Sequence, residues 1–342
     1  MQTVYSDRHR HQDGQSELID GKLVPCFECP ERADLVLARV HERSIGPVVE
    51  PTEHGLDPVR RVHTSPFVEF LSTAWDDWVA AHGEYDALPL TWPTRGARHD
   101  RIPGAIDGRL SYFSLDAGTP ITAGTWSAIT AAADVALTGV DLVLGGERHA
   151  FSLCRPPGHH ASADVYGGYC FFNNAAIAAQ SLRDRGAERV AVLDVDYHHG
   201  NGTQSIFYDR DDVVFASLHG HPQQEYPYFL GYDDELGVGA GVGANRNWPL
   251  WHGSGWDEYG PALDEACGFL AGHRPDVLVV SLGVDTFVDD PISQFRLGHE
   301  HYLRIGERIA ALGLPTLVVF EGGYAVGEIG VNAVNVLEGL AG

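Results

Sequence analysis

Positive charge is scarce in this sequence of 342 residues, and the scarcity limits the partners that the protein can have. Lysine and arginine together number 23 against 47 aspartates and glutamates, which gives a formal net charge of −24 with the histidines neutral. A surface of this sign repels nucleic acids and anionic membranes and attracts cations. We therefore expect neither nucleic acid nor a membrane as a partner, and we favour a cationic one.

Long hydrophobic runs are also missing, and cysteines are few. No stretch approaches the roughly 18 consecutive apolar residues that a membrane-spanning helix needs. Met1 to Asp20 is polar and lacks the apolar segment of a secretory signal, so we expect a cytoplasmic protein. The odd count of five cysteines indicates reduced thiols. Cys26 and Cys29 form a lone C-x-x-C pair between Pro25 and Pro30, a context that indicates a structural rather than a redox role.

Hydrophobic periodicity predicts an α/β protein, folded as one domain over residues 1–342. From residue 126 to residue 340, apolar β-branched runs alternate with helical patterns, as in a parallel sheet with helices on both faces. Ser65 and Pro66 resemble the N-cap and first residue of a helix, and the glycine-rich stretch 220–255 is predicted as a loop. Strands are predicted at 3–6, 150–154, 189–195, 213–218, 277–282 and 316–320, and helices at 31–42, 126–144, 174–185, 203–208, 257–271, 299–312 and 328–340.

The stretch 83–124 departs from this alternation. It has four prolines, several glycines and little periodicity, and structureless connections of this length are uncommon in compact domains. Its aromatic residues, among them Tyr85, Trp92, Tyr112 and Phe113, indicate an ordered but irregular insertion.

The most informative motif follows the predicted strand at 189–195. Asp196 and His198 are two residues apart, so on an extended backbone their side chains leave the same face. A carboxylate and an imidazole at the mouth of a buried strand suit a zinc-class ion. Asp194 shares this face but lies deeper, where an unpaired carboxylate would be costly. It is therefore predicted to orient another histidine or to bind a cation.

Polar motifs follow three further strands of the predicted sheet. These are Arg155 to His160 after the strand at 150–154, Asp285 after the strand at 277–282, and Glu321 to Tyr324 after the strand at 316–320. In an open parallel sheet, ligands bind outside the carboxyl ends of the strands. The topology alone is therefore expected to bring these segments together.

The assembled residues fit the hydrolysis of an amide. Asp196, His198 and Asp285 would supply three ligands to a zinc ion and leave a fourth position open, as in catalytic zinc sites. The adjacent histidines His159 and His160 could remove a proton from the attacking water and protonate the leaving amine. Tyr324, after two glycines, could donate its hydroxyl to the tetrahedral oxyanion.

These motifs resemble the histone deacetylase superfamily, and the closer resemblance is to its bacterial acetylpolyamine amidohydrolases. The resemblance covers nearly the whole chain and implies the arginase–deacetylase fold, a three-layer α/β architecture with about eight parallel strands. It implies zinc at Asp196, His198 and Asp285, one ion per subunit, with Tyr324 as the electrophilic hydroxyl. The motifs are Arg155 to His160 (RPPGHH), Gly167 to Asn174 (GGYCFFNN), Asp194 to Thr203 (DVDYHHGNGT), Ser281 to Asp285 (SLGVD) and Glu321 to Tyr324 (EGGY).

The resemblance also implies supporting roles for other residues. Asp194 and Asn201 would back His159 and His160, and because Asn201 is not an aspartate, His160 is expected to act as the general acid. The substrate channel would be lined by Gly168, Tyr169 and Phe229. Structural K⁺ or Na⁺ would bind at an inner site formed by Asp194, Asp196, His198, Ser217 and Leu218 and at an outer site formed by the backbone carbonyls of Phe207, Arg210 and Val213.

In proteins of this type the insertion at 83–124 forms a homodimer and narrows the entrance to the active site. Acidic residues there, of which Asp107 and Asp116 are the nearest in the sequence, would meet the distal ammonium of the substrate. The expected activity is removal of the acetyl group from small cationic amines such as acetylputrescine and acetylcadaverine. The alternatives are an acetyl-lysine protein deacetylase with the same chemistry and a non-catalytic binder of acylated amines.

Overall fold

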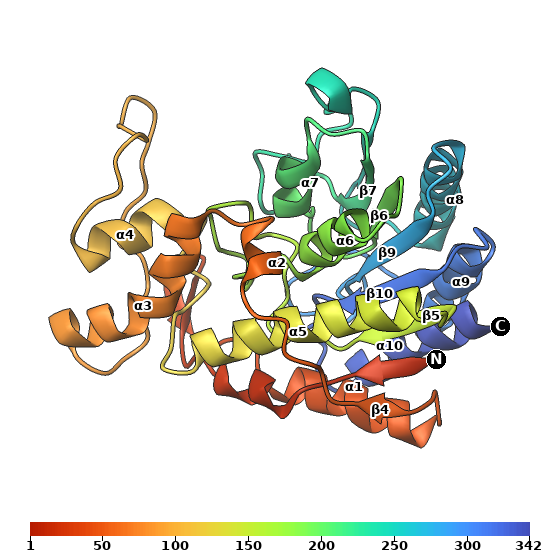
Figure 1. Cartoon of the computed structure of the whole chain (residues 1–342), viewed down its shortest axis with the longest axis horizontal. Helices are drawn as coiled ribbons and strands as arrows, with labels where there is room; N and C mark the ends of the chain where they lie inside the picture. The colour runs from red at the N-terminus through yellow and green to blue at the C-terminus, as the bar shows by residue number, and fades with distance from the viewer.

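The computed structural model describes all residues 1–342 and has an eight-stranded sheet at its centre (Figure 1). Every neighbouring pair of strands in the sheet is parallel, and the order is β4-β1-β5-β10-β9-β6-β7-β8. The α/β class and the number of strands expected from the sequence are confirmed. The strands are β1 Gln2–Val4, β4 Val48–Val49, β5 His149–Ser152, β6 Val190–Asp194, β7 Val213–Gly220, β8 Asn245–Leu250, β9 Val277–Leu282 and β10 Thr316–Phe320.

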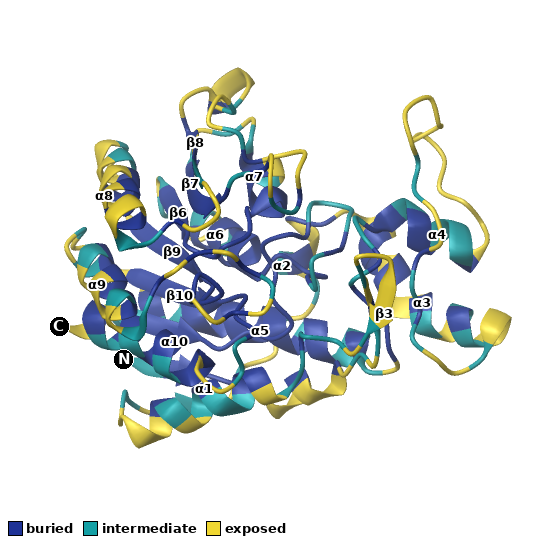
Figure 2. Cartoon of the chain, turned by 180° about the vertical axis from the view of Figure 1, so that it is seen from behind, coloured by how far each residue is buried: buried dark blue, intermediate teal, exposed yellow.

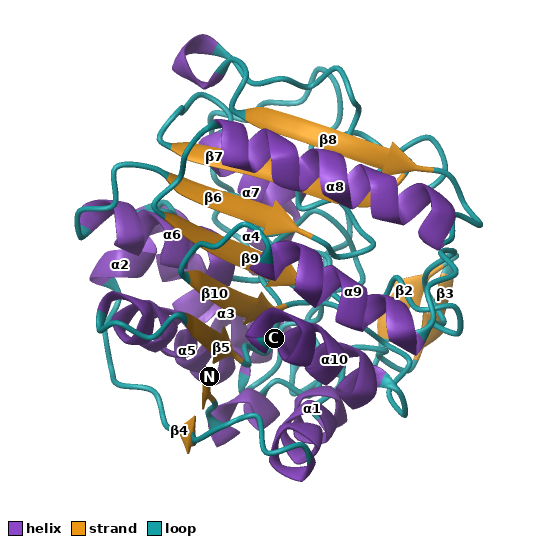
Figure 3. Cartoon of the chain, turned by 90° about the vertical axis from the view of Figure 1, so that its right-hand side faces the viewer, coloured by secondary structure: helices purple, strands orange, loops and turns teal.

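Helices cover both faces of the sheet. Figure 3 shows α8, α9 and α10 in front of the strands and α5 and α6 behind them. The helices are α1 Glu31–Glu42, α2 Asp57–Arg60, α3 Ser65–His82, α4 Ile106–Phe113, α5 Thr125–Leu144, α6 Asn174–Asp184, α7 Asn201–Phe207, α8 Trp256–Gly272, α9 His299–Ala310 and α10 Ile329–Ala341, with short 3-10 helices at Asp7–His11 and Gly239–Gly241.

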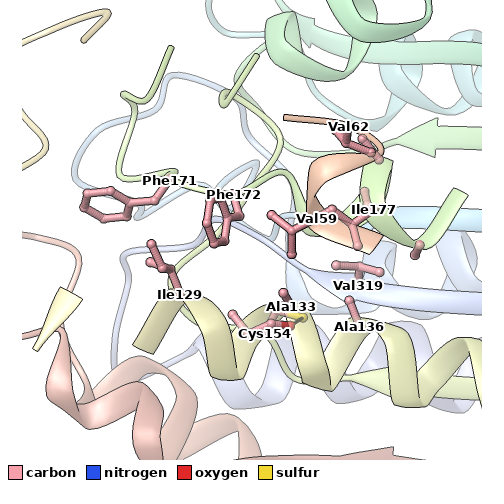
Figure 4. Close-up of a cluster of buried hydrophobic side chains, with 14 of the residues drawn as sticks. Val59, Val62, Ile129, Ala133, Ala136, Cys154, Phe171, Phe172, Ile177 and Val319 are labelled. Carbon is pink, nitrogen blue, oxygen red and sulfur yellow. Dashed lines mark hydrogen bonds between the residues drawn. The ribbon is translucent and has the colours of Figure 1, made fainter. Parts of the chain in front are cut away.

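Alternate residues of each strand pack on opposite faces of the sheet. In β6, Val190 and Val192 join the hydrophobic cluster on the α5–α6 side, and Ala191 and Leu193 join the cluster on the α8–α10 side. Both faces are therefore apolar, which explains the unbroken hydrophobic runs in the sequence. Figure 4 shows part of the first cluster, where Val319 of β10 lies near residues of α5.

Helix α5 is long and apolar enough to cross a membrane by composition alone. Within the structure, however, 67% of its most apolar stretch is buried. The helix lies along one face of the sheet (Figure 1) and contributes several residues to the first cluster. Its hydrophobic character is that of a core helix.

The insertion at 83–124 is less irregular than predicted, because it contains helix α4. This helix escaped prediction because it is only eight residues long, has no side-chain cap and includes Gly108, a poor helix former. Ile106, Leu110 and Phe113 nevertheless give it a buried face. The preceding loop projects from the body and is exposed (Figure 2), with Leu90 at 81% exposure.

The glycine-rich stretch 220–255 was also wrongly predicted as loop throughout, because it contains strand β8. The sequence of β8 is polar and includes Pro249, which a strand tolerates only at the edge of a sheet. β8 is indeed an edge strand and pairs only with β7. Hydrophobic patterning alone could not identify it.

Two smaller features near the N-terminus also differ from the sequence prediction. Strands β2 Glu17–Ile19 and β3 Lys22–Val24 form a separate hairpin whose turn has positive φ at Asp20 and Gly21. An Asp-Gly pair is a strong hairpin signal that could have been read from the sequence. Helix α3 begins at Ser65, so the N-cap position belongs to Thr64 rather than to Ser65.

Two helical glycines allow a test of the packing. A Cβ atom at Gly139 in α5 would collide with Ser152 and lie 2.5 Å from Leu317, whereas a Cβ at Gly268 in α8 would meet nothing within 4 Å. We expect Gly139→Ala to lower the free energy of unfolding by about 1–3 kcal/mol through overpacking. Gly268→Ala should raise it by up to about 1 kcal/mol, because alanine favours helix. Urea denaturation followed by circular dichroism measures both, and stabilisation by Gly139→Ala would contradict the packing described here.

Candidate active site

Three metal-ligating side chains meet beyond the carboxyl ends of β6 and β9. Asp196 and His198 follow β6, Asp285 follows β9, and their ligand atoms all lie within 4.8 Å of one another. His198 Nδ1 lies 2.9 Å from Asp285 Oδ2 and 3.4 Å from Asp196 Oδ1. All three residues are buried. The structure thus brings together the three ligands expected from the sequence.

Backbone N–H groups orient the two carboxylates. Asp196 accepts hydrogen bonds from the N–H of His198 at 2.9 Å and of Gly322 at 2.8 Å, and Asp285 accepts one from the N–H of Tyr197 at 2.8 Å. A side chain at Gly322 would not fit, since its Cβ would lie 2.6 Å from Asp196 Oδ2. The glycine therefore lets the loop after β10 approach the cluster closely.

The electrostatics of the cluster favour a divalent cation. Burial and the neighbouring Asp196 raise the pKa of Asp285 to about 8. Burial lowers the pKa of His198, but hydrogen bonds and charge interactions with Asp196 and Asp285 outweigh it and raise that pKa well above its usual value. The two buried carboxylates thus stabilise a positive charge at this point, and a zinc-class ion held between them and a neutral His198 would supply it. The donor set of two carboxylate oxygens and one imidazole nitrogen fits zinc.

The adjacent histidines His159 and His160 differ in their surroundings. His159 Nδ1 lies 3.0 Å from Asp194 Oδ2, and His160 Nδ1 lies 2.6 Å from Asn201 Oδ1. Burial lowers the pKa of His159, but Asp196 and Asp194 outweigh it and raise that pKa to about 10. Burial, His159 and His198 together hold the pKa of His160 well below its usual value. Groups whose pKa values are pushed apart in this way suit separate acid and base roles.

The orientation of the Asn201 amide decides which nitrogen of His160 carries a proton. When rotated, the amide nitrogen donates to His160 Nδ1 at 2.6 Å and to the His199 carbonyl at 3.3 Å, and its oxygen accepts from the Gly202 N–H at 3.3 Å. That orientation would place the proton of neutral His160 on Nε2. With the amide oxygen toward the ring, His160 Nδ1 donates to Asn201 Oδ1 at 2.6 Å and Nε2 is free to accept a proton, as the proton-transfer role of His160 requires.

Tyr324 is buried in a loop that two charged residues hold through its backbone. Arg32 donates to the carbonyls of Glu321 at 2.7 Å and Gly323 at 2.6 Å, and its guanidinium carbon lies 4.7 Å from the centroid of the Tyr324 ring. Asp290 accepts from the N–H of Tyr324 at 2.7 Å. Burial raises the pKa of Tyr324 well above its usual value although Arg32 lowers it, so the hydroxyl remains a donor. Arg32 and Asp290 were not predicted from the sequence, because the residues that they contact are distant along the chain and no sequence motif links them.

Two aromatic side chains flank the site, and one of them is not the residue expected. The ring of Tyr169, beside Gly168, packs on that of Tyr324 with centroids 5.4 Å apart. Phe229, predicted in the channel, is 85% exposed. Tyr226 lies edge-on to His160 at 5.1 Å instead. The loop after β7 thus supplies an aromatic residue, but three positions earlier than predicted.

The acidic residues expected to meet the substrate lie in different settings. Asp107, at the start of α4, is half-buried and pairs with His82 at 3.1 Å. Asp116 is half-buried and accepts hydrogen bonds from Gly168 and from Tyr226. Glu17, which the sequence did not single out, is fully buried near this region and has one oxygen without a partner. Of the two predicted acids, Asp116 contacts residues that flank the site, whereas Asp107 pairs with His82.

The residues predicted for monovalent cations lie in two groups along β6, α7 and β7. Asp194 and Ser217 face each other in the ladder between β6 and β7, next to Leu218, and Asp196 and His198 follow directly. Ser217 Oγ lies 2.8 Å from His219 Nδ1. The outer group, Phe207, Arg210 and Val213, lies around the connection from α7 to β7.

His159, Cys170 and Glu321 form a second close grouping, but their chemistry fits a metal poorly. Burial raises the pKa of the Cys170 thiol well above its usual value, whereas a ligating cysteine must be a thiolate. One oxygen of Glu321 already accepts from the N–H of Gly158 at 2.6 Å. All five cysteines of the chain are free.

The sequence and the fold of this chain are similar to those of several known proteins. A family model described as the histone deacetylase domain matches residues 26–340. Acetylpolyamine amidohydrolase 1 of Pseudomonas aeruginosa is 60% identical, over 100% of this chain and 99% of that protein. Acetylpolyamine amidohydrolase of Mycoplana ramosa is 49% identical over 100% of both. The crystal structure of acetylpolyamine aminohydrolase from Burkholderia pseudomallei superposes with a TM-score of 0.95 at 38% identity, covering 100% of this chain and 98% of that one.

Proposed function

This chain belongs to the histone deacetylase family, and from that premise we propose that it is a zinc-dependent amidohydrolase that removes acetyl groups from small cationic amines. The observation that carries the proposal is the buried Asp196–His198–Asp285 cluster, with His159, His160 and Tyr324 contributed by neighbouring loops. Full-length similarity to proteins named acetylpolyamine amidohydrolases supports the substrate class. The proposed substrates are of the acetylputrescine and acetylcadaverine type.

The mechanism follows from the residues around the cluster. Zinc held by Asp196, His198 and Asp285, one ion per subunit, would supply Lewis acidity toward the acyl carbonyl and the attacking water. His160, whose Nδ1 contacts Asn201, takes the proton of the attacking water at its Nε2, and His159, backed by Asp194, holds a second proton beside it. Tyr324 keeps its hydroxyl proton and donates a hydrogen bond to the oxyanion. The neutral amine leaves after accepting a proton from the histidine pair.

Several further properties are part of this proposal. The whole chain acts as one domain in the cytoplasm, and it forms a homodimer through the 83–124 insertion. The exposed loop before α4, with Leu90 at its surface, is consistent with such a contact. Structural K⁺ or Na⁺ would bind at the two groups along β6, α7 and β7 described above, with Asp194 central to the inner one.

Two alternatives are separated from this proposal by simple assays. An acetyl-lysine protein deacetylase would turn over acetylated histone peptides faster than acetylputrescine. A non-catalytic binder would bind acylated amines without releasing acetate. Zinc-loaded protein tested on acetylputrescine, acetylcadaverine, acetylspermidine and acetyl-lysine peptides therefore decides between them.

We expect substrate charge to govern turnover. A chain of net charge −24 should attract a substrate with a distal ammonium. Acetylputrescine is compared with N-pentylacetamide, in which a methyl group replaces the ammonium. The kcat/KM for acetylputrescine should fall about three- to tenfold between low and high ionic strength, because salt screens the attraction.

The uncharged amide is the control for this experiment. It should be a poorer substrate and show little dependence on salt. Equal turnover of the two amides at low salt would contradict the proposed preference for cationic amines and leave the amidohydrolase chemistry untouched.

A further inference from the structure

Asp116 accepts four hydrogen bonds that join distant parts of the chain. Its Oδ1 accepts from the N–H of Gly118 at 2.9 Å and the hydroxyl of Thr119 at 3.1 Å. Its Oδ2 accepts from the N–H of Gly168 at 2.6 Å and the hydroxyl of Tyr226 at 2.7 Å. A carboxylate offers about four acceptor positions, so both oxygens of Asp116 are fully engaged within the protein.

The two distant partners of Asp116 belong to separate segments that each contact a residue of the active site. Gly168 precedes Tyr169, whose ring packs on Tyr324. Tyr226 comes from the loop after β7, and its ring meets His160 with centroids 5.1 Å apart and planes at 87°. Asp116 therefore links the segment carrying one flanking aromatic residue to the hydroxyl of the other.

The turn that carries Tyr169 needs external support. Gly168 and Tyr169 have φ angles of 54° and 66°, a conformation that is costly for tyrosine. The N–H of Tyr169 donates to Thr119 Oγ1 at 2.9 Å, and the N–H of Gly168 donates to Asp116. A Cβ at Gly168 would collide with the ring of His160, so this turn lies directly against a proton-transfer residue. A shift of the turn would alter the space beside His160.

We propose that Asp116 is a positioning residue that fixes the separation of Tyr169 and Tyr226, and thereby selects slim, unbranched amides, rather than the partner of the distal ammonium of the substrate. The inference rests on the proposed function in taking an acylated amine as the ligand. It replaces the role expected for Asp116 from the sequence. To bind an ammonium, Asp116 would have to release one of its four present donors.

A double-mutant cycle tests this inference. Tyr226→Phe keeps the ring and deletes only the hydroxyl, and Asp116→Asn removes the charge while nearly preserving the shape. Because a hydrogen bond to a charged group is lost, each variant should raise KM about tenfold. The rise should be equal for acetylputrescine and for N-pentylacetamide, with kcat within about twofold of wild type. The double variant should be no worse than Asp116→Asn alone, because both changes break one interaction.

Selectivity between unbranched and branched amides is a measurement that should not change if Asp116 only stabilises the fold. In both single variants, the kcat/KM ratio of N-pentylacetamide to an amide branched beside the nitrogen should fall, because the flanking rings are released. Tyr228→Phe and Asp233→Asn make the same chemical changes at exposed positions of the same loop. These controls should behave as wild type. The melting temperature of each variant shows whether its higher KM comes from a destabilised fold. If Asp116→Asn folds poorly, Tyr226→Phe alone still tests the inference.

Three results would overturn the inference. The first is a rise in KM after Asp116→Asn for acetylputrescine alone, which would make Asp116 the ammonium partner. The second is an unchanged Tyr226→Phe enzyme. The third is a double variant whose effects multiply, which would mean that the two residues act independently.

Failure of the proposed function can be recognised separately. A wild-type enzyme that hydrolyses N-pentylacetamide but not acetylputrescine refutes the polyamine assignment, and the cycle is still read on the uncharged amide. A wild-type protein that binds acetylputrescine without hydrolysing it refutes the proposed enzymatic activity. The double-mutant cycle is then measured with Kd values from calorimetry. Absence of both hydrolysis and binding overturns the two proposals together.

Discussion

Replacing Asp285 with alanine should remove the bound metal and the activity together. The substitution deletes one of the three proposed ligands and leaves Asp196 and His198, too few to hold zinc in a catalytic site. A metal ion supplies several kcal/mol of transition-state stabilisation. We therefore expect kcat/KM for acetylputrescine to fall by at least about 10³-fold, since each 1.4 kcal/mol or so is a factor of ten.

Metal content by mass spectrometry and acetate release by the same preparation measure the two effects. Asp289→Ala is the matched control, because Asp289 is an exposed carboxylate four positions further along the same loop. It should retain a full equivalent of zinc and full activity. Asp285→Ala protein that purified with one zinc per subunit would show that the ligand assignment is wrong.

Replacing Tyr324 with phenylalanine should leave the metal in place and slow the chemistry. The ring keeps its packing on Tyr169 and under Arg32, and only the hydroxyl is lost. Loss of one oxyanion donor typically lowers kcat by about 10²–10³-fold. Because the lost interaction is made in the transition state, KM should change little.

The measurement is steady-state kinetics at matched zinc occupancy. Burial keeps the pKa of Tyr324 well above its usual value, so the hydroxyl is protonated throughout the neutral range. The ratio of wild-type to variant kcat should therefore be constant between about pH 7 and pH 9. A variant with near-wild-type kcat would remove Tyr324 from the mechanism.

The regular part of the fold could be predicted because its strands are apolar on both faces. Strand β10, for example, has the predicted bounds, since every residue of 316–320 is buried on one side of the sheet or the other. β8 could not be predicted, because its polar sequence is stable only as an edge strand against β7. Helix α4 likewise depends on packing by Ile106, Leu110 and Phe113 rather than on its own propensity.

The ligand cluster was predictable for a topological reason. Parallel strands deliver their carboxyl-terminal residues to one edge, so Asp196, His198 and Asp285 could be grouped from their positions after two strands. The flanking residue Tyr226 could not be chosen over Phe229 in this way, because both lie in one irregular loop. Only the folded loop shows which ring turns toward His160 and which toward solvent.

The class of fold, the grouping of the candidate ligands and the acidic charge follow from the amino-acid sequence, because they depend on periodicity, on position after a strand and on composition. The contacts of Asp116 and Arg32 depend instead on tertiary packing. Asp116 reads as a free acid in the sequence, yet four donors from three segments occupy its oxygens. Arg32 lies on the buried side of α1 and holds the Tyr324 loop through carbonyls almost 300 positions away. Such contacts depend on where separate segments meet in space, and hydrogen bonds between them leave no periodic trace in the chain.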